Sequence, residues 1–166
     1  LSRFDRIEVR KSTTVISAEK IERYVYFIES GMARAYKETA KGETTIWFGG
    51  AGDVMLSFLS FFKNEPGYES IEMLEESILY RISSNQLQEL YGQHIHIANW
   101  GRKFAEQELI NAEQRFMDLQ FKTPTERYHD LLTNSPDILR RVQLGHIASY
   151  LGITQVSLSR IRAAVK

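Results

Sequence analysis

The spacing of the apolar residues in this chain changes at Ser83, and that change constrains the fold more than any other feature. Before it, short β-rich runs alternate with glycine-containing turns, as in a small antiparallel barrel or jelly roll. After it, apolar residues recur every three or four positions, which is the spacing of amphipathic helices. We therefore predict an α+β chain with an N-terminal antiparallel β-roll (jelly roll) and a helical C-terminal part. The predicted strands are YVYFIE, MARAYKE, TTIWF, SIEML and SILYRI.

Glycines mark the turns of the predicted roll. Gly31 and the Lys41-Gly42 pair separate the first three runs, and Gly42 and Gly52 stand where a positive φ would be least costly. The FLSFF cluster that follows Ser57 is less regular. It fits one buried turn of helix leading into a loop, and it fits a buried strand almost as well.

The longest helical segment runs from about Ile95 to Leu119, after a shorter helix, SNQLQELY, that the capping box Ser83 and Gln86 opens. Two apolar stripes follow its length. One stripe could cover the roll while the other, small at its start, packs against the same helix of a second copy in an isologous dimer. Burial of both stripes within one chain is the alternative. The first stripe is Ala98, Gly101, Ala105, Leu109, Ala112, Phe116 and Leu119, and the second is Ile97, Trp100 and Phe104.

Two signals place a boundary near residue 122. Thr123 and Glu126 form a second capping box, and Pro124 occupies the first helical position, where a missing N–H costs nothing. The charge also changes sign there, because residues 1–121 hold 14 basic and 18 acidic residues whereas residues 122–166 hold 7 and 3. The chain as a whole is neutral, but its C-terminal segment is a candidate surface for an anionic partner.

Composition excludes several kinds of chemistry. The 166 residues are 43% hydrophobic and 25% charged, as in folded domains. There is no cysteine, which excludes disulfides, thiolate metal sites and thiol catalysis and favours the reducing cytoplasm. No apolar run approaches the roughly 20 residues of a membrane span, so no membrane partner is expected. The chain begins at Leu1 without a signal-peptide pattern, and residues upstream of it can be missing.

The most specific pattern lies within 145–162. Ala148 is small enough to let a second helix cross closely, Gly152 permits a tight turn, and Thr154 caps the next helix. This is the arrangement of a helix-turn-helix, whose second helix enters the major groove of DNA. The alternative is a helical hairpin with a solvated basic face. The inward positions are Ile147, Ala148, Leu151, Ile153, Leu158 and Ile161.

With these motifs the chain resembles the Crp/Fnr family of bacterial transcription regulators over nearly all of its length. The resemblance rests on YFIESGMARAY, the KGE turn before TTIWF, and AGDV in the roll, and more strongly on the helix-turn-helix. It implies a cyclic-nucleotide-binding-like β-roll at 1–91, a long dimerisation helix at 92–121 and a helix-turn-helix domain at 122–166. It also implies a homodimer that is not an enzyme and binds double-stranded DNA, and it leaves RNA polymerase open as a further partner. The family's β-hairpin wing is absent because the chain stops at Lys166, so the wing is either naturally lost or truncated.

The family's recognition-helix pattern of arginine, glutamate and arginine falls on Gln155, Val156 and Arg160, so only the last is retained. Arg160 is the best candidate for a base contact, Gln155 would bind a different base, and Val156 could at most touch a thymine methyl. The operator of better-known members therefore does not carry over. The predicted phosphate contacts are Thr154, Ser157 and Arg162.

The effector site departs further from the family. Leu56-Ser57 stands where nucleotide-binding members carry Gly-Glu, and Gly67-Tyr68-Glu69 stands where they carry Arg-Ser/Thr-Ala. No arginine lies between Arg34 and Arg81, so the cation that a cyclic phosphate needs is missing from this segment, and Glu69 would repel an anion. Cyclic AMP is therefore not expected, and the effector is unidentified. The pocket for this effector could be lined by Ser57, Tyr68 and Glu69, or the roll could be filled by its own FLSFF side chains.

Two interpretations from other classes stay open. His94 and His96 form an HxH pair, which in a jelly roll invites comparison with the cupin metal enzymes. Cupins need a glutamate four or five residues after the second histidine, where Trp100 and Gly101 stand, so no catalytic or metal site is assigned; a haem held by one histidine stays open. The rivals are a small-ligand or metal-binding jelly-roll protein or enzyme without DNA binding, and a ligand-sensing protein that has lost DNA binding.

Overall fold

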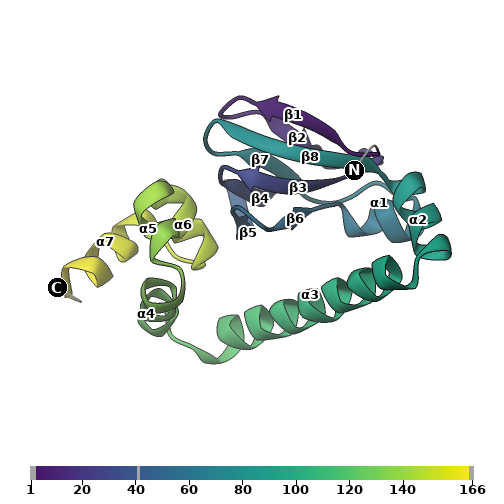
Figure 1. Ribbon diagram of the computed structural model, residues 1–166. Helices are drawn as coiled ribbons and strands as arrows, with labels where there is room; N and C mark the ends of the chain where they lie inside the picture. The colour runs from purple at the N-terminus through teal and green to yellow at the C-terminus, as the bar shows by residue number, and fades with distance from the viewer. Residues whose placement is uncertain (1–2, 41, 165–166) are drawn as a thin grey trace. The chain divides into compact units, whose positions relative to one another are not determined.

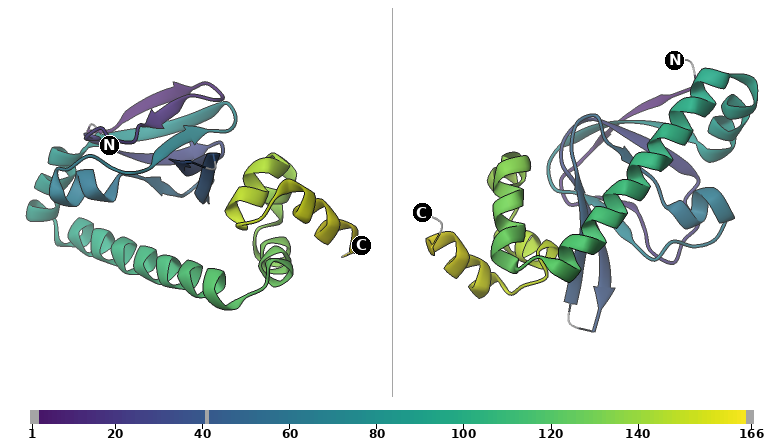
Figure 2. Two further views of the ribbon diagram at one scale, coloured as in Figure 1. Left: turned by 180° about the vertical axis from the view of Figure 1, so that it is seen from behind. Right: turned by 90° about the horizontal axis from the view of Figure 1, so that it is seen from below.

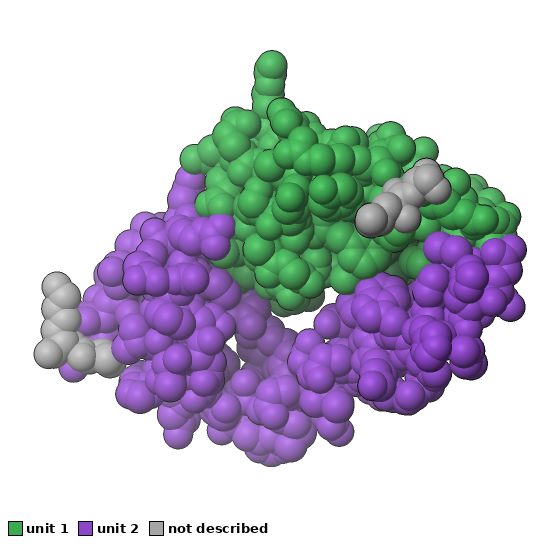
Figure 3. Space-filling model, viewed as in Figure 1, with its two compact units in different colours: residues 1–89 green, residues 90–166 purple. Residues whose placement is uncertain are grey.

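A computed structural model describes residues 3–40 and 42–164 and divides the chain into two compact units, residues 1–89 and 90–166 (Figures 1 and 3). Each unit has its own internal architecture. Helix α2 (Ser84–Gln93) crosses the boundary between them. None of the described helices is both long and apolar enough to span a bilayer.

The first unit is a roll of two four-stranded sheets, one ordered β1-β8-β3-β6 and the other β2-β7-β4-β5 (Figure 2). The strand pairs are antiparallel. The predicted α+β class and antiparallel β-roll are confirmed, and all five predicted runs form strands. The strands are β1 (Asp5–Val9), β2 (Thr14–Ile16), β3 (Tyr24–Ser30), β4 (Ala33–Thr39), β5 (Gly42–Gly49), β6 (Val54–Met55), β7 (Ser70–Met73) and β8 (Ser77–Ser83).

Alternation along β4 sends its side chains to the two faces of its sheet. Ala33 and Ala35 pair with Met73 and Ile71 of β7, and all four belong to the core, whereas Arg34 between them faces the other side. Three strands escaped the sequence analysis: β1, and the very short β2 and β6, which hold too few residues to display a period. The buried core cluster is Ile16, Tyr26, Ile28, Ala33, Ala35, Met55, Ile71, Met73 and Leu79.

The turn glycines adopt the expected backbone. Gly42 has φ 104° and Gly52 has φ 94°, conformations that glycine reaches without steric cost. Lys41, the other half of the predicted Lys41-Gly42 turn, lies outside the described residues. Gly31 has φ 121° and packs so closely that a Cβ there would lie 2.0 Å from Ser77 Oγ. Any side chain at this turn would therefore have to displace β8.

The FLSFF cluster forms helix α1 (Phe58–Lys63), so its helical interpretation is right and its buried character is wrong. Phe58 and Phe62 are exposed and stack on one another with ring centroids 6.0 Å apart. Ser60 is the buried residue of α1. The strands fill the interior of the roll themselves, which leaves Phe58 and Phe62 on the outer side of this short helix while Phe61 is half-buried.

The second unit is helical. The two predicted capping boxes are both present, one in each unit: Ser83 Oγ accepts from the Gln86 N–H at 3.2 Å, and Thr123 Oγ1 accepts from the Glu126 N–H at 3.3 Å. Pro124 is the first residue of its helix, as predicted. The remaining helices are α3 (Ile95–Phe121), α4 (Pro124–Asn134), α5 (Pro136–Arg141), α6 (Leu144–Tyr150) and α7 (Gln155–Ala164).

Helix α3 extends for 27 residues and contains no buried residue. At the small start of the first stripe, Gly101 lies against Tyr91 of α2, since a Cβ on Gly101 would lie 2.6 Å from the phenol oxygen. The predicted contact of this stripe with the same helix of a second copy stays a prediction. Farther along, Leu109 is 72% exposed and Phe116 is 60% exposed. The larger half of the stripe thus stays open to solvent in the single chain.

Candidate nucleic-acid interface

The turn between α6 and α7 has the geometry that the glycine predicts. Gly152 has φ 69°, its N–H donates to Ser149 O at 3.1 Å, and the Ile153 N–H donates to Ala148 O at 3.0 Å. These two bonds form a Schellman motif, which ends α6 and redirects the chain. Thr154 then caps α7, since the Ser157 N–H donates to Thr154 Oγ1 at 3.2 Å. The two helices are therefore joined by a compact helix-turn-helix turn.

The inner face of this motif is buried as expected, and its outer face is open. The most buried residues are Ile147, Leu151 and Leu158, each at most 1% exposed, with Ala148 at 2%. Ile153 and Ile161 are half-buried. Burial on one side leaves the opposite side of α7 as a free surface. The exposed residues there are Gln155, Val156, Ser159, Arg160 and Arg162.

The predicted base-contacting residues share this free surface. Val156 is 62% exposed on the first turn, next to Gln155, and Arg160 stands one turn farther along. Gln155 leans toward α6, because its Oε1 is 3.6 Å from where a Cβ on Gly145 would be. A bulkier residue at Gly145 would contact this amide. The three side chains are thus positioned by rigid helix rather than by a loop.

The predicted phosphate contacts are less uniform. Thr154 and Arg162 are exposed, whereas Ser157 is half-buried and its hydroxyl lies 3.0 Å from Thr154 Oγ1. One of these two hydroxyls donates to the other, so only one of the pair has its proton free to donate to a phosphate. The cap and the predicted contact therefore use the same two side chains.

Arginines outside the motif hold it in place, and sequence analysis missed them. Arg127 of α4 donates to Leu151 O at 2.8 Å and also to Lys122 O, and Arg115 of α3 donates to Tyr150 O. One signal was present in the sequence. Arg127 is the fourth residue of α4. The positive end of the helix dipole disfavours a cation at this place unless nearby acceptors stabilise it.

In the roll, the structure brings two of the three predicted effector residues together. A Cβ on Gly67 would lie 2.3 Å from Ser57 Oγ and 3.4 Å from Glu69 Oε1, so both oxygens converge on this glycine. Ser57 is buried, and its Oγ has no hydrogen-bond partner among the described residues. Tyr68 points elsewhere: it is exposed and lies under Lys37, whose Nζ is 5.3 Å from the ring centroid.

Arg34 is the most buried charged residue in the described part of the roll, and sequence analysis named it only as the end of an arginine-free stretch. It is 1% exposed and forms ion pairs with Glu43 of β5 and, at 2.9 Å from Nε to Oε1, with Glu72 of β7. Its guanidinium also lies over the Tyr36 ring at 4.4 Å. The register that sets Arg34 opposite Glu72 creates this cluster.

Comparison with known proteins agrees with this architecture. The family model described as "Cyclic nucleotide-binding domain" matches residues 6–94, which is more than half of the chain. The chain belongs to the cyclic nucleotide-binding domain family. No curated protein matches it.

Solved structures extend the likeness of this cyclic nucleotide-binding domain protein to its helices. FixK2 from Bradyrhizobium japonicum matches with a TM-score of 0.82 at 21% identity, covering 98% of this chain and 84% of that one. The c-di-GMP responsive global regulator CLP from Xanthomonas campestris gives 0.75 at 18%, covering 99% and 87%. A CooA mutant from Carboxydothermus hydrogenoformans gives 0.79 at 16%, covering 98% and 76%. The predicted resemblance to the Crp/Fnr fold is thereby confirmed.

The histidine pair does not form a metal centre in the described part of the cyclic nucleotide-binding domain protein. His94 is the N-cap of α3 without a side-chain cap bond, and both His94 and His96 are exposed. Among residues 3–40 and 42–164, no group of three or more histidine, cysteine, aspartate or glutamate side chains is arranged to hold a metal ion. The jelly-roll enzyme interpretation gains no support from this region.

The capping box of α4 makes the helical unit sensitive to acid. Hydrogen bonds from the Thr123 hydroxyl and N–H, both at 2.7 Å, hold the pKa of Glu126 below its ordinary value. Because the pKa of Glu126 is lower in the folded chain than its ordinary value of 4.5, its ionised carboxylate stabilises the fold above pH 4.5. This stabilisation is lost as the pH falls through the folded-state pKa. We expect Glu126→Gln, which keeps the cap geometry without a titrating proton, to flatten this acid loss.

The measurement is the thermal unfolding midpoint of the chain's helical signal as a function of pH, for the parent and for Glu126→Gln. Glu113→Gln, at an exposed glutamate of α3 outside the capping box, is the matched control. Equal acid sensitivity of the parent and Glu126→Gln would show that the cap does not carry the effect.

Proposed function

We propose that the chain is a homodimeric, DNA-binding transcription regulator of the Crp/Fnr type. The observation that carries the proposal is α7, whose inner face is buried in a capped helix-turn-helix while Gln155, Val156 and Arg160 stand exposed on its outer face. The fold shared with FixK2 and CLP supports it. In such a protein α7 enters the major groove of a near-palindromic operator, with half-sites about one helical turn, roughly 34 Å, apart.

The dimer of this proposal forms through the helix at 92–121, and residues 122–166 are its DNA-binding domain. Helix α3 supports this division because its large apolar side chains, Leu109 and Phe116 among them, are exposed in the described part of the chain. An isologous contact between two such helices would cover them. The partners are double-stranded DNA and a second copy of the chain, with RNA polymerase as a further candidate, and the compartment is the cytoplasm.

The proposed effector site is the point where the Ser57 and Glu69 oxygens converge on Gly67; Tyr68, whose ring lies under Lys37, is left out of it. A carboxylate at this point opposes a cyclic phosphate, and Arg34, the buried cation among the described residues of the roll, is already paired with two glutamates. The effector is therefore a molecule other than cyclic AMP. Ligand binding there would alter the spacing of the two recognition helices and thus the affinity for DNA.

Selection of random duplex DNA by the purified protein, at two salt concentrations, tests the proposal. An enriched two-fold-symmetric site with affinity that falls steeply with salt is the expected result, because phosphate contacts dominate binding. If no sequence is enriched, either with the protein alone or after a screen of ligands on the roll, DNA recognition is not its function. Stoichiometric metal in the purified protein would favour the jelly-roll enzyme instead.

Arg160→Ala should weaken operator binding by about 1–3 kcal/mol and relax specificity at one base pair of each half-site. The reason is that a guanidinium can donate two hydrogen bonds to guanine, and no other exposed arginine lies on the first two turns of α7. Competition binding with single-base operator variants measures the effect. Arg140→Ala, at an exposed arginine of α5 paired with Asp137, is the control and should leave the base preference unchanged. Unaltered discrimination by Arg160→Ala would remove Arg160 from the list of base contacts.

A further inference from the structure

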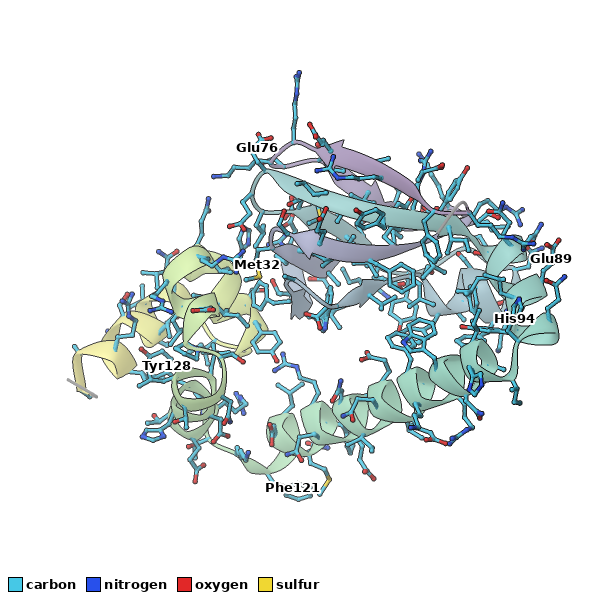
Figure 4. All side chains as sticks on the ribbon, in the orientation of Figure 1. Met32, Glu76, Glu89, His94, Phe121 and Tyr128 are labelled. Atoms are coloured by element: carbon cyan, nitrogen blue, oxygen red, sulfur yellow. The ribbon has the colours of Figure 1, made fainter. Side chains whose placement is uncertain are left out.

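We propose that Arg115, Arg127 and Tyr150 form a clamp that fixes the orientation of the recognition helix relative to α3, and that Arg115 is its positioning residue. The consequence for DNA rests on the proposed function, because fixed orientation in a dimer sets the spacing of half-sites. The clamp itself is a property of the second unit alone, in which α4 to α7 follow the C-terminal end of α3 (Figures 2 and 4).

The covalent connection between α3 and the helix-turn-helix domain is short and offers little rigidity. Lys122 lies between the last residue of α3 and Thr123, the N-cap of α4, with an extended backbone at φ −94° and ψ 141°. Lys122 Nζ reaches Asp118 at 2.8 Å and Asp130 at 2.7 Å, in a half-buried cluster that ties α3 to α4 but does not reach the helix-turn-helix. A rotation about the extended linker would swing the whole domain unless other contacts opposed it.

Arg127 provides the first of those contacts by joining the ends of two helices. Its Nη1 donates to Lys122 O and, at 3.4 Å, to Asp118 O, both at the C-terminal end of α3. Its Nη2 donates to Leu151 O at 2.8 Å, at the end of α6. The carbonyl ends of helices carry partial negative charge, so a cation shared between two of them is favourable. One planar guanidinium therefore ties α3 to the turn of the helix-turn-helix.

Arg115 provides the second contact from the opposite direction. It projects from α3 one turn before Leu119, donates to Tyr150 O, and lies over the Tyr150 ring with its guanidinium carbon 3.8 Å from the centroid. Burial lowers the pKa of Arg115, which marks a cation withdrawn from water, and Arg115 remains protonated. The stacked ring and the carbonyl oxygen that accepts its hydrogen bond hold this side chain in one orientation.

Together the two arginines grip the last residues of α6 immediately before the Schellman turn. Tyr150 and Leu151 precede Gly152 and Thr154, and the capped first turn of α7 follows at once. Apolar packing adds little here, since α3 has no buried residue and Leu119 Cδ2 only approaches within 3.9 Å of a Cβ position on Gly152. Polar contacts to backbone carbonyls therefore decide where α7 points from α3.

The test uses the absence of native cysteine. Spin labels on Lys103→Cys of α3 and Ala163→Cys of α7, both exposed positions, report the distance between the two helices by pulsed electron resonance, with excess unlabelled chain to isolate single labelled copies. The parent should give one narrow distribution and Arg115→Gln a broad one. Arg102→Gln, an α3 arginine paired only with Glu106 by an ion pair on its own helix, is the control and should stay narrow. An equally narrow distance distribution for a folded Arg115→Gln variant overturns the clamp, independently of the result of any DNA-binding measurement.

The functional arm measures binding of the same variants to duplexes with one half-site, and to two half-sites whose separation changes in single base pairs. Arg115→Gln should bind one half-site within about twofold of the parent, lose about tenfold at the best separation, and tolerate neighbouring separations better, because preorganisation is lost. An unchanged separation profile, or an equal loss on one half-site, contradicts the positioning role. Failure of the parent itself to bind DNA would overturn the proposed function while the label distances still decide the clamp.

Discussion

Replacing both Leu109 and Phe116 by aspartate is expected to convert the protein to a monomer and to weaken operator binding by at least about a hundredfold. These two side chains are the most exposed of the large residues in the first stripe of α3, at 72% and 60%. Burial of each is worth roughly 1.5–3 kcal/mol, and an isologous contact counts each of them twice. A monomer also loses the avidity of two linked half-site contacts, and that avidity alone raises the affinity for DNA by a factor of about 10²–10⁴.

Sedimentation and DNA titration measure the two effects on the same sample. Lys103→Asp is the matched control, since Lys103 is exposed on α3 away from both stripes. It should remain dimeric and bind DNA as the parent does. A Leu109→Asp, Phe116→Asp protein that stayed dimeric would place the interface elsewhere on the molecule.

Arg34→Met is expected to destabilise the roll by about 2–4 kcal/mol. Removing the cation takes from Glu72, which is 19% exposed, the ion pair that offsets its burial, and it also removes the ion pair with Glu43. Breaking a fully buried ion pair costs about 3–5 kcal/mol of stability. The loss expected here is smaller, because Glu43 is 46% exposed and can rehydrate. Combining the change with Glu72→Gln should recover part of the loss.

Denaturant unfolding of the full chain, followed by tryptophan fluorescence in a Trp100→Phe background, measures this loss of stability. In that background Trp47 is the remaining tryptophan, so the signal reports the unfolding of the roll. Arg81→Met is the control, because Arg81 forms a solvated ion pair with Asp5 and should cost less than about 1 kcal/mol. If Arg34→Met unfolded at the same denaturant concentration as the parent, the buried cluster would contribute nothing to the stability of the roll.

The helix-turn-helix was predictable because its determinants are local. Gly152, Thr154 and the apolar residues on either side of them act through hydrogen bonds and contacts within about five positions, and the Schellman turn and cap are present as expected. The remaining features of the candidate site can be predicted from the sequence only in part. The expected phosphate contacts Thr154 and Ser157 are bonded to one another, a detail that depends on side-chain rotamers rather than residue types.

Long-range pairings account for what sequence analysis missed or misassigned. Arg115 meets Tyr150 across 35 positions, and Tyr91 of α2 lies against Gly101, a contact that the sequence analysis did not predict. The exposure of Phe58 and Phe62 likewise follows from strands that already fill the roll. None of these pairings has a fixed spacing along the chain, so no periodicity announces them.

Five of the eight described strands, both capping boxes and the helix-turn-helix follow from the sequence alone, because backbone hydrogen bonding and amphipathic spacing act between near neighbours. Which charges are buried and which distant groups meet depends instead on the folded arrangement of the chain. Strand register set Arg34 between two glutamates, and the return of α6 toward the end of α3 set Tyr150 against Arg115. Such contacts depend on the path of the whole chain, which no short segment encodes.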